Sequence, residues 1–169
     1  MMVEIRMARL KDVEGIAKVC IDANRDTYKY THSEEFIERT ISEFYNYKRI
    51  KQEVLHTSSS WQGWFVAIEN DKVVGAIGGG MINDEKGEIF VLYLDINKRR
   101  EGIGTLLLNY LTDIQKKDGA LEQWVSVAKG NQKGIPFYEA KGFKRVKEIK
   151  SFESAENENY TSYRYSRNI

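Results

Sequence analysis

Cysteine and proline are nearly absent from this sequence, each occurring once among its 169 residues, as Cys20 and Pro136. A single cysteine excludes an intrachain disulfide bond and any metal site built from several thiolates, which suits a reducing compartment. Long apolar runs are missing as well, because the N-terminal MMVEIRMARLKDVEG mixes charged with apolar residues, unlike a signal peptide or a membrane-spanning helix. We therefore expect a cytoplasmic protein with no membrane partner.

An excess of charge of one sign is also missing. The 26 lysines and arginines nearly balance the 25 aspartates and glutamates, which leaves a formal net charge of +1 at pH 7. Such a chain has no strong field to attract nucleic acid, and no predicted helix carries the basic cluster of a DNA-binding module. Histidine is scarce too, and His32 and His56 lack the paired spacing of metal ligands. We expect neither a nucleic-acid partner nor a metal site.

Short strands and amphipathic helices are what the sequence does contain. Apolar residues make up 41% of the chain and charged residues 30%, as in ordinary globular proteins, and this length fits one domain. Alternating apolar residues predict strands at 3–8, 64–69, 72–82, 88–95, 121–128, 143–149 and 160–165. Helical spacing predicts helices that begin after Asp12, after Ser33 and at 103, with a short one near 131–141, whereas 48–62 indicates a loop. Polar turns between the three strands from 64 to 95 predict an antiparallel meander, so the chain is expected to be α+β.

Two glycines follow three consecutive cations in the stretch NKRREGIGTLLLNYL, residues 97–111, where a predicted strand leads into a predicted helix. The N–H groups at a helix N-terminus attract anions, and glycine lets a phosphate approach the backbone closely. Residues 100–105 therefore form a candidate phosphate cradle, with the cations at 98–100 as mobile charges around it. A surface turn before an ordinary helix is the alternative. The stretch lacks a Walker A loop, and Leu107 stands where the dinucleotide fingerprint needs a third glycine or an alanine.

Two motifs resemble those of the GNAT superfamily of acyl-CoA N-acetyltransferases, in particular its small bacterial members. RREGIG at 99–104 matches the pattern [RQ]-x-x-G-x-[GA] between a strand and a helix. NQKGIPFYEAKGFKRV at 131–146 is similar to the second signature, an Asn followed by Phe-Tyr-Glu and then Gly-Phe. The resemblance spans 3–167 and implies a single GNAT-like domain over 1–169. Its fold would be α+β, with a mixed, mostly antiparallel twisted central sheet flanked by helices on both faces.

The resemblance also implies where acetyl-CoA, the co-substrate of the family, is bound. The pantetheine arm is expected to pair with the main chain of Leu92, Tyr93 and Leu94. The cradle is expected to hold the pyrophosphate, and its matching residues are Arg99, Arg100, Glu101, Gly102, Ile103, Gly104 and Thr105. Asn131 matches an Asn at the coenzyme, and Tyr138 matches the tyrosine that protonates the leaving thiolate as a general acid. For any one of ten tyrosines, packing in the core is the alternative.

The single proline lies inside the second motif. A proline beyond the first turn of a helix removes a hydrogen bond and clashes with the preceding turn. We therefore expect the short helix to begin near Gly134 or Ile135, so that Pro136 lies in its first turn.

The general base is less determined than the acid. The attacking amine must be neutral, so a carboxylate or an ordered water has to accept its proton. Glu88 is the first carboxylate candidate and Asp95 the second, with a solvated charge at a strand end as the alternative for each. Ser126 lies where some relatives carry a glutamate, so no base is expected there.

The acceptor is expected to be a primary amine, on a small molecule, a polyamine or a protein N-terminus or lysine. In the family its pocket is shaped by the first helical region and its loops, here 24–47 and 56–64, which are similar to those of small bacterial polyamine acetyltransferases. The expected apolar walls are Tyr28, Tyr30, Trp61 and Trp64, and the acidic residues expected to attract the amine are Glu34, Glu35, Glu38 and Glu43. A solvated helix face and core aromatic residues are the alternative.

The predicted activity is direct transfer of an acetyl group from acetyl-CoA to the amine within a ternary complex. A catalytically weak acyl-CoA-binding module with a regulatory or interaction role is the alternative, because a fold does not by itself imply an activity. The intact cradle and Tyr138 favour the enzyme. The sequence leaves homodimerisation open.

Overall fold

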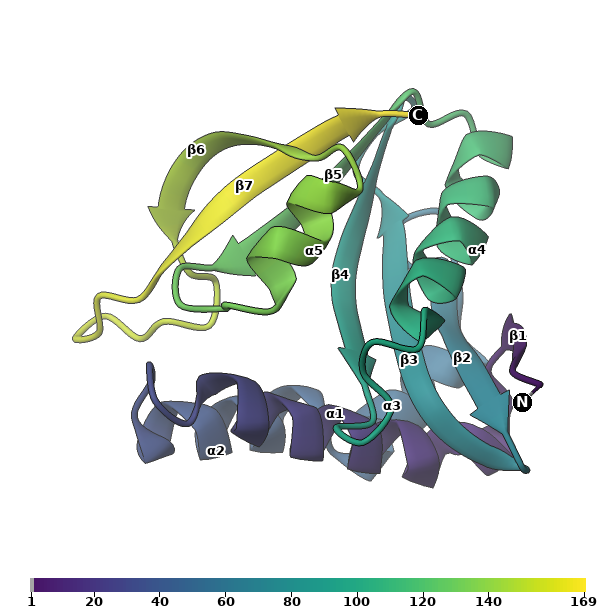
Figure 1. Ribbon diagram of the computed structural model, residues 1–169, viewed down its shortest axis with the longest axis horizontal. Coiled ribbons are helices and arrows are strands. Elements are labelled where there is room, and N and C mark those ends of the chain that lie inside the picture. The colour runs from purple at the N-terminus through teal and green to yellow at the C-terminus, as the bar shows by residue number, and fades with distance from the viewer. Residues whose placement is uncertain (1) are drawn as a thin grey trace.

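The computed structural model describes residues 2–169, in which seven strands form one sheet with helices around it (Figure 1). The strands are β1 (Glu4–Met7), β2 (Gly63–Glu69), β3 (Lys72–Met81), β4 (Lys86–Leu94), β5 (Glu122–Ala128), β6 (Lys144–Lys150) and β7 (Thr161–Asn168). The helices are α1 (Val13–Tyr28), α2 (Glu34–Phe44), α3 (Tyr47–Leu55), α4 (Ile103–Lys117) and α5 (Gly134–Ala140), with a 3₁₀ turn at Leu10–Asp12. The strand order is β1-β2-β3-β4-β5-β7-β6, and every neighbouring pair is antiparallel except β4 and β5.

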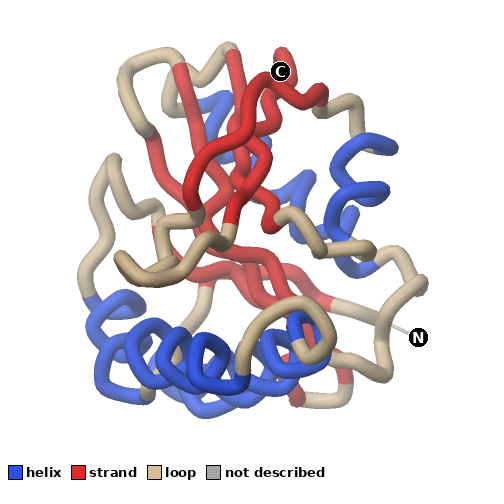
Figure 2. The backbone as a smooth tube through the Cα atoms, turned by 90° about the vertical axis from the view of Figure 1, so that its left-hand side faces the viewer, coloured by secondary structure: helices blue, strands red, loops and turns tan. Residues whose placement is uncertain are grey.

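Helices cover both faces of the sheet (Figures 1 and 2). Successive side chains of a strand point to opposite faces, and β2 shows this clearly. Trp64 and Val66 pack in a core with α1, whereas Phe65 and Ala67 pack in a second core with α4. Because β2 and β3 are buried on both faces, they are rich in apolar residues throughout. The arrangement confirms the predicted α+β fold with a mixed, mostly antiparallel sheet.

The pairing between β4 and β5 is short. It runs from Lys86 opposite Glu122 to Ile89 opposite Val125, and beyond Ile89 no residue of 2–169 pairs with β4 on that side. At the same point Gly78 lies opposite Val91 and Gly79 opposite Ile89, so Phe90 is the extra residue of a β-bulge. The two halves of the sheet separate from here on, and the edge of β4 beyond the bulge is left without a strand partner (Figure 1).

The prediction of a loop over 48–62 is wrong for its first part, because α3 forms at Tyr47–Leu55. The backbone N–H of Arg49 donates to the Asn46 side chain at 2.8 Å, which caps the N-terminus of this helix. Tyr47, Ile50 and Val54 recur at helical spacing, but the segment is mostly polar and only Ile50 is fully buried, so the helix is easily overlooked in the sequence. Residues 56–62 are irregular, as expected.

Other local predictions are confirmed. The Ser33 hydroxyl accepts from the N–H of Phe36 at 3.0 Å and caps α2. The helix α5 begins at Gly134, which leaves Pro136 in the first turn, and Gly142 follows the helix with a left-handed φ of 91°. Among residues 2–169, no helix combines the length and apolarity needed to cross a membrane.

Candidate active site

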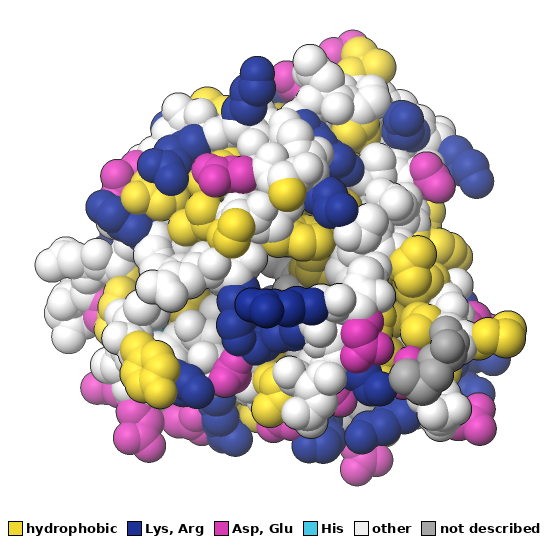
Figure 3. Space-filling view, in the orientation of Figure 1, with side chains coloured by type: hydrophobic (Ala, Val, Ile, Leu, Met, Phe, Trp, Pro, Cys, Tyr) yellow, Lys and Arg dark blue, Asp and Glu magenta, His cyan; other side chains and the backbone are white. Residues whose placement is uncertain are grey.

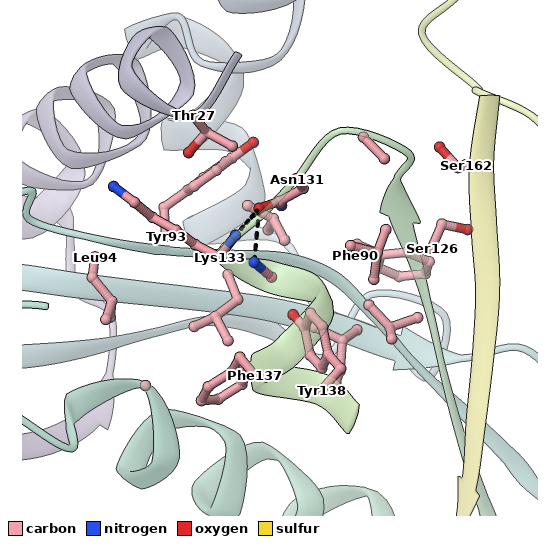
Figure 4. Close-up of a pocket in the computed structure, with 18 of the residues that line it drawn as sticks. Thr27, Phe90, Tyr93, Leu94, Ser126, Asn131, Lys133, Phe137, Tyr138 and Ser162 are labelled. Atoms are coloured by element: carbon pink, nitrogen blue, oxygen red, sulfur yellow. Dashed lines mark hydrogen bonds between the residues drawn. The ribbon is translucent and has the colours of Figure 1, made fainter. Parts of the chain in front are cut away.

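A cleft of about 1220 Å³ opens where β4 and β5 separate. Its walls come from α1, the junction of α2 and α3, β4, α5 and the segment that joins β6 to β7. Figure 3 shows Lys and Arg side chains gathered beside the hollow between the two halves of the molecule. Figure 4 shows side chains of β4, β5 and α5 that line this space. The cleft therefore brings together segments that are far apart in the sequence.

The loop between β4 and α4 shapes the candidate phosphate cradle. Arg100 and Gly102 adopt left-handed φ angles of 69° and 84°, a conformation that costs a residue with a Cβ about 1–2 kcal/mol. The N–H of Leu106 donates to the carbonyl of Gly102, but no acceptor among residues 2–169 meets the N–H groups of 103–105. Three free donors at the N-terminus of a helix form a site for an anion.

Two of the three cations beside the cradle are held in ion pairs, whereas all three were expected to be mobile. Lys98 Nζ lies 2.7 Å from the buried Glu69 carboxylate of β2, and Arg99 donates to Asp26 of α1. Arg100 forms no ion pair with any residue of 2–169. The partners lie 29 or more positions from these cations in the sequence, so local spacing cannot reveal them.

Asp26 connects the cradle to the segment before α5. Its carboxylate accepts from Arg99 and also from Lys133 Nζ at 3.2 Å, and Lys29 Nζ lies 3.1 Å away. Hydrogen bonds from Arg99 and then from Lys29 hold the pKa of Asp26 well below its ordinary value. An ionised Asp26 therefore holds two cations of the cleft in place.

The predicted coenzyme contacts at β4 and Asn131 lie in the same cleft. Leu92, Tyr93 and Leu94 line it from the edge of β4 that lacks a strand partner. The Asn131 side-chain oxygen accepts from the N–H groups of Gly134 at 2.7 Å and Lys133 at 3.3 Å (Figure 4). Because these bonds occupy the oxygen, the side-chain NH₂ of Asn131, which lies beside the hydroxyl of Tyr28, is the group that can donate to a ligand.

Tyr138 lies on α5 with its ring buried and its hydroxyl at the cleft (Figure 4). The ring packs edge-on against Phe137 and Phe143, with centroid distances of 5.2 and 5.4 Å. Burial raises the pKa of Tyr138 above its ordinary value, and Tyr28 nearby adds to this effect. The hydroxyl therefore keeps its proton at neutral pH.

Glu88 lines the cleft but is not a solvated charge. Arg164 donates to its two carboxylate oxygens at 2.6 and 2.9 Å, and both side chains are about 15% exposed. The same guanidinium donates to the hydroxyl of Ser126 at 2.9 Å. Asp95, the second candidate base, lies outside the lining of the cleft, where it accepts from the N–H of Asn97.

The far end of the cleft is aromatic and acidic. The rings that line it are Phe44, Tyr45, Trp61, Trp64, Phe90 and Phe152. Two carboxylates join them. Glu53 accepts from Trp64 Nε1 at 3.0 Å and pairs with Arg49, which also lines the cleft, at 3.4 Å. Glu153 comes from the segment between β6 and β7. Enclosure by the cleft raises the pKa of Glu153, and Glu43 adds to this effect.

The sequence predicts the walls of this end only in part. Tyr28, Trp61 and Trp64 line the cleft as expected, but Tyr30 is 89% exposed and lies outside it. None of the four expected acidic residues lines the cleft, and Glu38 instead pairs with Arg25 at 2.7 Å. Glu53 and Glu153 were missed because they lie in α3, mistaken for a loop, and in a segment without a motif.

Metal-ligating side chains do not gather among the residues that the structure describes. Within 2–169, His, Cys, Asp and Glu side chains form no group of three able to hold an ion. His32 stacks on Tyr160 with ring centroids 4.2 Å apart, in an aromatic cluster that joins α2 to the segment before β7.

Comparisons with known proteins identify relatives of the chain. The sequence profile of the Acetyltransferase (GNAT) family matches residues 20–143. A spermidine N(1)-acetyltransferase of Thermoplasma acidophilum is 32% identical over 85% of this chain and 89% of its own length. An uncharacterized N-acetyltransferase of Bacillus subtilis is 34% identical over 87% of this chain and 83% of its own. The crystal structure of the PaiA N-acetyltransferase from T. acidophilum, in complex with coenzyme A, superposes with a TM-score of 0.85 at 27% identity and covers both chains completely.

Proposed function

The chain belongs to the GNAT acetyltransferase family, and we propose that it acetylates a primary amine of an aliphatic polyamine. The predictions of the family, of N-acetyltransferase activity and of acetyl-CoA as the acyl donor are confirmed. What we propose is the identity of the acceptor amine, the roles of the individual site residues, and that residues 1–169 act as one domain. The observation that carries the acceptor is the aromatic and acidic far end of the cleft that also contains the cradle and Tyr138.

The cleft fits coenzyme A. Free N–H groups at 103–105 would hold the pyrophosphate, since they have no acceptor among residues 2–169. The edge of β4 at Leu92–Leu94 would pair with the amide groups of the pantetheine arm, and the Asn131 NH₂ group would donate to the same arm. Bound acetyl-CoA supplies a thioester carbonyl that an amine can attack.

Tyr138 would act as the general acid. A phenol is a weaker acid than a thiol, so its proton reaches the sulfur only if the two lie within hydrogen-bond distance while the C–S bond breaks. The hydroxyl of Tyr138 opens into the cleft, where that sulfur would lie. The pKa of Tyr138, raised by burial, keeps this donor loaded with its proton. Phe137 and Phe143 hold its ring in one orientation.

Glu88, directly or through a water, would accept the proton that the amine loses. Its carboxylate lines the cleft near the bulge at Phe90, and Arg164 orients it through two hydrogen bonds. A water beside Glu88 serves the same role without direct contact.

The far end of the cleft supports a polyamine as the acceptor. A polyamine presents one neutral amine for attack while its other nitrogens remain ammonium groups on a flexible alkyl chain. Glu153 offers negative charge for such groups, whereas Glu53 is already paired with Arg49 at 3.4 Å. The rings of Trp61, Phe90 and Phe152 offer apolar faces that attract both alkyl chains and cations. The 32% identical relative named for spermidine acetylation supports the same class.

The test is the release of free thiol from acetyl-CoA with a panel of amines: putrescine, spermidine, spermine, propylamine, lysine and a peptide with a free N-terminus. We expect the polyamines to give the highest kcat/KM. In Glu153→Gln, the KM for spermidine should rise by about tenfold and that for propylamine by less than about twofold, because only the former places a second charge in the cleft. The control Glu156→Gln, exposed in the same segment, should change neither.

Two results would contradict the proposal. Preference for the peptide or for lysine would assign the cleft to another acceptor class. Coenzyme A binding without transfer to any amine would favour the acyl-CoA-binding module. Calorimetry with coenzyme A, carried out alongside the panel, separates these outcomes from a protein that has lost its fold.

A further inference from the structure

Three consecutive glycines in β3, Gly78 to Gly80, demand a physical reason. Glycine weakens a strand because it loses the most conformational freedom and leaves no side chain to pack. None of the three has a left-handed φ, so the backbone conformation does not require them. The space around them does. A Cβ at Gly78 would lie 2.5 Å from Cη2 and 2.9 Å from Cζ3 of Trp61, and one at Gly80 would overlap the carbonyl of Ser60.

The segment before β2 therefore lies directly on this strand. The N–H of Gln62 donates to the carbonyl of Gly79, and the N–H of Met81 donates to the carbonyl of Ser59, both at 2.8 Å. These bonds hold the segment against β3 on the face that carries α1 and α3. Only residues without a Cβ permit this distance at positions 78 and 80.

The indole of Trp61 is held from several sides. Its Nε1 donates to the carbonyl of Glu53 in α3 at 2.8 Å, and its ring meets Trp64 edge-on at 5.7 Å. Gly78 lies beneath its outer edge, and Phe90 lies beside it at 6.3 Å with a tilt of 26°. The remaining surface of the indole lines the cleft. A push from β3 would therefore move the ring toward the space in which an acceptor would lie.

We propose that Gly78 and Trp61 together set the width of the acceptor end of the cleft and so select slim, unbranched alkylamines. This inference rests on the proposed acetylation of an amine in that cleft. The indole forms a flat wall along the alkyl chain, and the missing Cβ at position 78 lets that wall lie deep enough for the chain to pass. Phe90, 52% exposed on the bulge of β4, provides a second apolar surface for the same chain.

The width of the acceptor end of the cleft can be tested with two amines, unbranched butylamine and bulky benzylamine, each assayed with the wild type and with the variants. In Gly78→Ala the KM for butylamine should rise by about tenfold, because the displaced indole narrows the cleft, while kcat and the affinity for coenzyme A stay within about twofold. In Trp61→Ala and Trp61→Phe the ratio of kcat/KM for benzylamine over butylamine should rise, by about tenfold in the former.

The double variant Gly78→Ala with Trp61→Ala supplies the decisive comparison. With the indole absent, the added methyl group has nothing to displace, so the KM for butylamine should match that of Trp61→Ala within about twofold. Gly15→Ala is the control for crowding alone, since its Cβ would lie 2.7 Å from the Val73 side chain, away from the cleft. This variant should have a lower melting temperature and an unchanged KM for both butylamine and benzylamine.

The inference would be overturned if Gly78→Ala and Gly15→Ala changed the KM for butylamine equally. It would also be overturned if the ratio of kcat/KM for benzylamine over butylamine stayed unchanged in both Trp61 variants. Calorimetric titration of the same amines into the protein loaded with coenzyme A repeats the comparison without turnover. If wild type transfers no acetyl group to any amine, the proposed function fails; the titrations still decide whether Trp61 controls which amine fits.

Discussion

Arg164 of β7 holds Glu88 of β4 through hydrogen bonds of 2.6 and 2.9 Å, across the strand β5 that lies between them. The pair lies where β4 and β5 begin to separate, since Ile89 is the last residue of β4 that pairs with β5. Arg164 also contacts Ser126 on β5, so one guanidinium connects three neighbouring strands at the base of the cleft. The contact joins the two halves of the sheet. It also orients Glu88, which lines the cleft, whereas the second candidate base, Asp95, does not.

The Glu88→Gln substitution tests that base, because it keeps the shape of the side chain and removes its charge. We expect kcat to fall by about 10²–10³ while the affinity for coenzyme A changes by less than about twofold. Steady-state kinetics and calorimetry measure the two quantities. Glu122→Gln on β5, outside the lining of the cleft, is the control. A full kcat with only a raised amine KM would show that water alone takes the proton.

Tyr138→Phe tests the general acid and its dependence on pH. Burial disfavours the phenolate and raises the pKa of Tyr138, so the hydroxyl remains protonated from neutral pH into the alkaline range. Removing it should lower kcat by about 10²–10⁴, and by the same factor at each pH from about 7 to about 10. Coenzyme A affinity should change only a few-fold. If the kcat of the wild type instead fell between pH about 7 and about 10 while that of Tyr138→Phe did not, Tyr138 would have an ordinary tyrosine pKa.

The phosphate cradle predicts coenzyme A binding at micromolar strength, or about −8 kcal/mol. Gly102→Asp should weaken it by about 100-fold or more, because a carboxylate enters the cradle and a left-handed residue gains a Cβ. Gly142→Asp is the matched control, since Gly142 has a similar φ of 91° outside the lining of the cleft. Calorimetry with pantetheine completes the test: an affinity equal to that of coenzyme A would exclude the pyrophosphate from the cradle.

Asp26→Asn should tighten the binding of coenzyme A by about three- to tenfold at low salt. The carboxylate holds Arg99 and Lys133 and lies beside the cradle, so its removal frees two cations and removes a charge that repels phosphate. The gain should shrink as salt is added. Weaker binding in the variant would show that Asp26 positions the two cations rather than competing with the ligand for them.

The same variant should be less sensitive to acid. Hydrogen bonds from Arg99 and Lys29 lower the pKa of Asp26, so their contribution to stability is present above the ordinary carboxyl pKa and is lost as pH falls through the lowered one. At pH 7 we expect Asp26→Asn to cost about 1 kcal/mol of unfolding free energy in urea, given that the side chain is 23% exposed. Below about pH 3 the difference from wild type should narrow.

Local chemistry in the sequence determined much of the fold. Alternating apolar residues mark the strands of the meander, Ser33 marks the start of α2, and Gly142 follows α5 with a left-handed φ. Pro136 restricts where α5 begins, because its ring is tolerated only in the first turn. Gly102 of the cradle is also a local feature, since its left-handed φ of 84° favours a residue without a Cβ. Each of these features depends on residues within a few positions of one another.

The tertiary structure alone decided which side chains share the cleft. Helix α3 has few apolar residues, so its cap and its packing had to be seen before Glu53 joined the site. Asp26 contacts Lys133, which lies 107 positions away in the sequence, and Arg164 contacts Glu88, which lies 76 positions away. Glu153 comes from a segment that contains no motif. Such contacts follow from strand order and the separation of β4 from β5. Charge pairing carries no sequence period, so it becomes specific only when the fold brings the partners together.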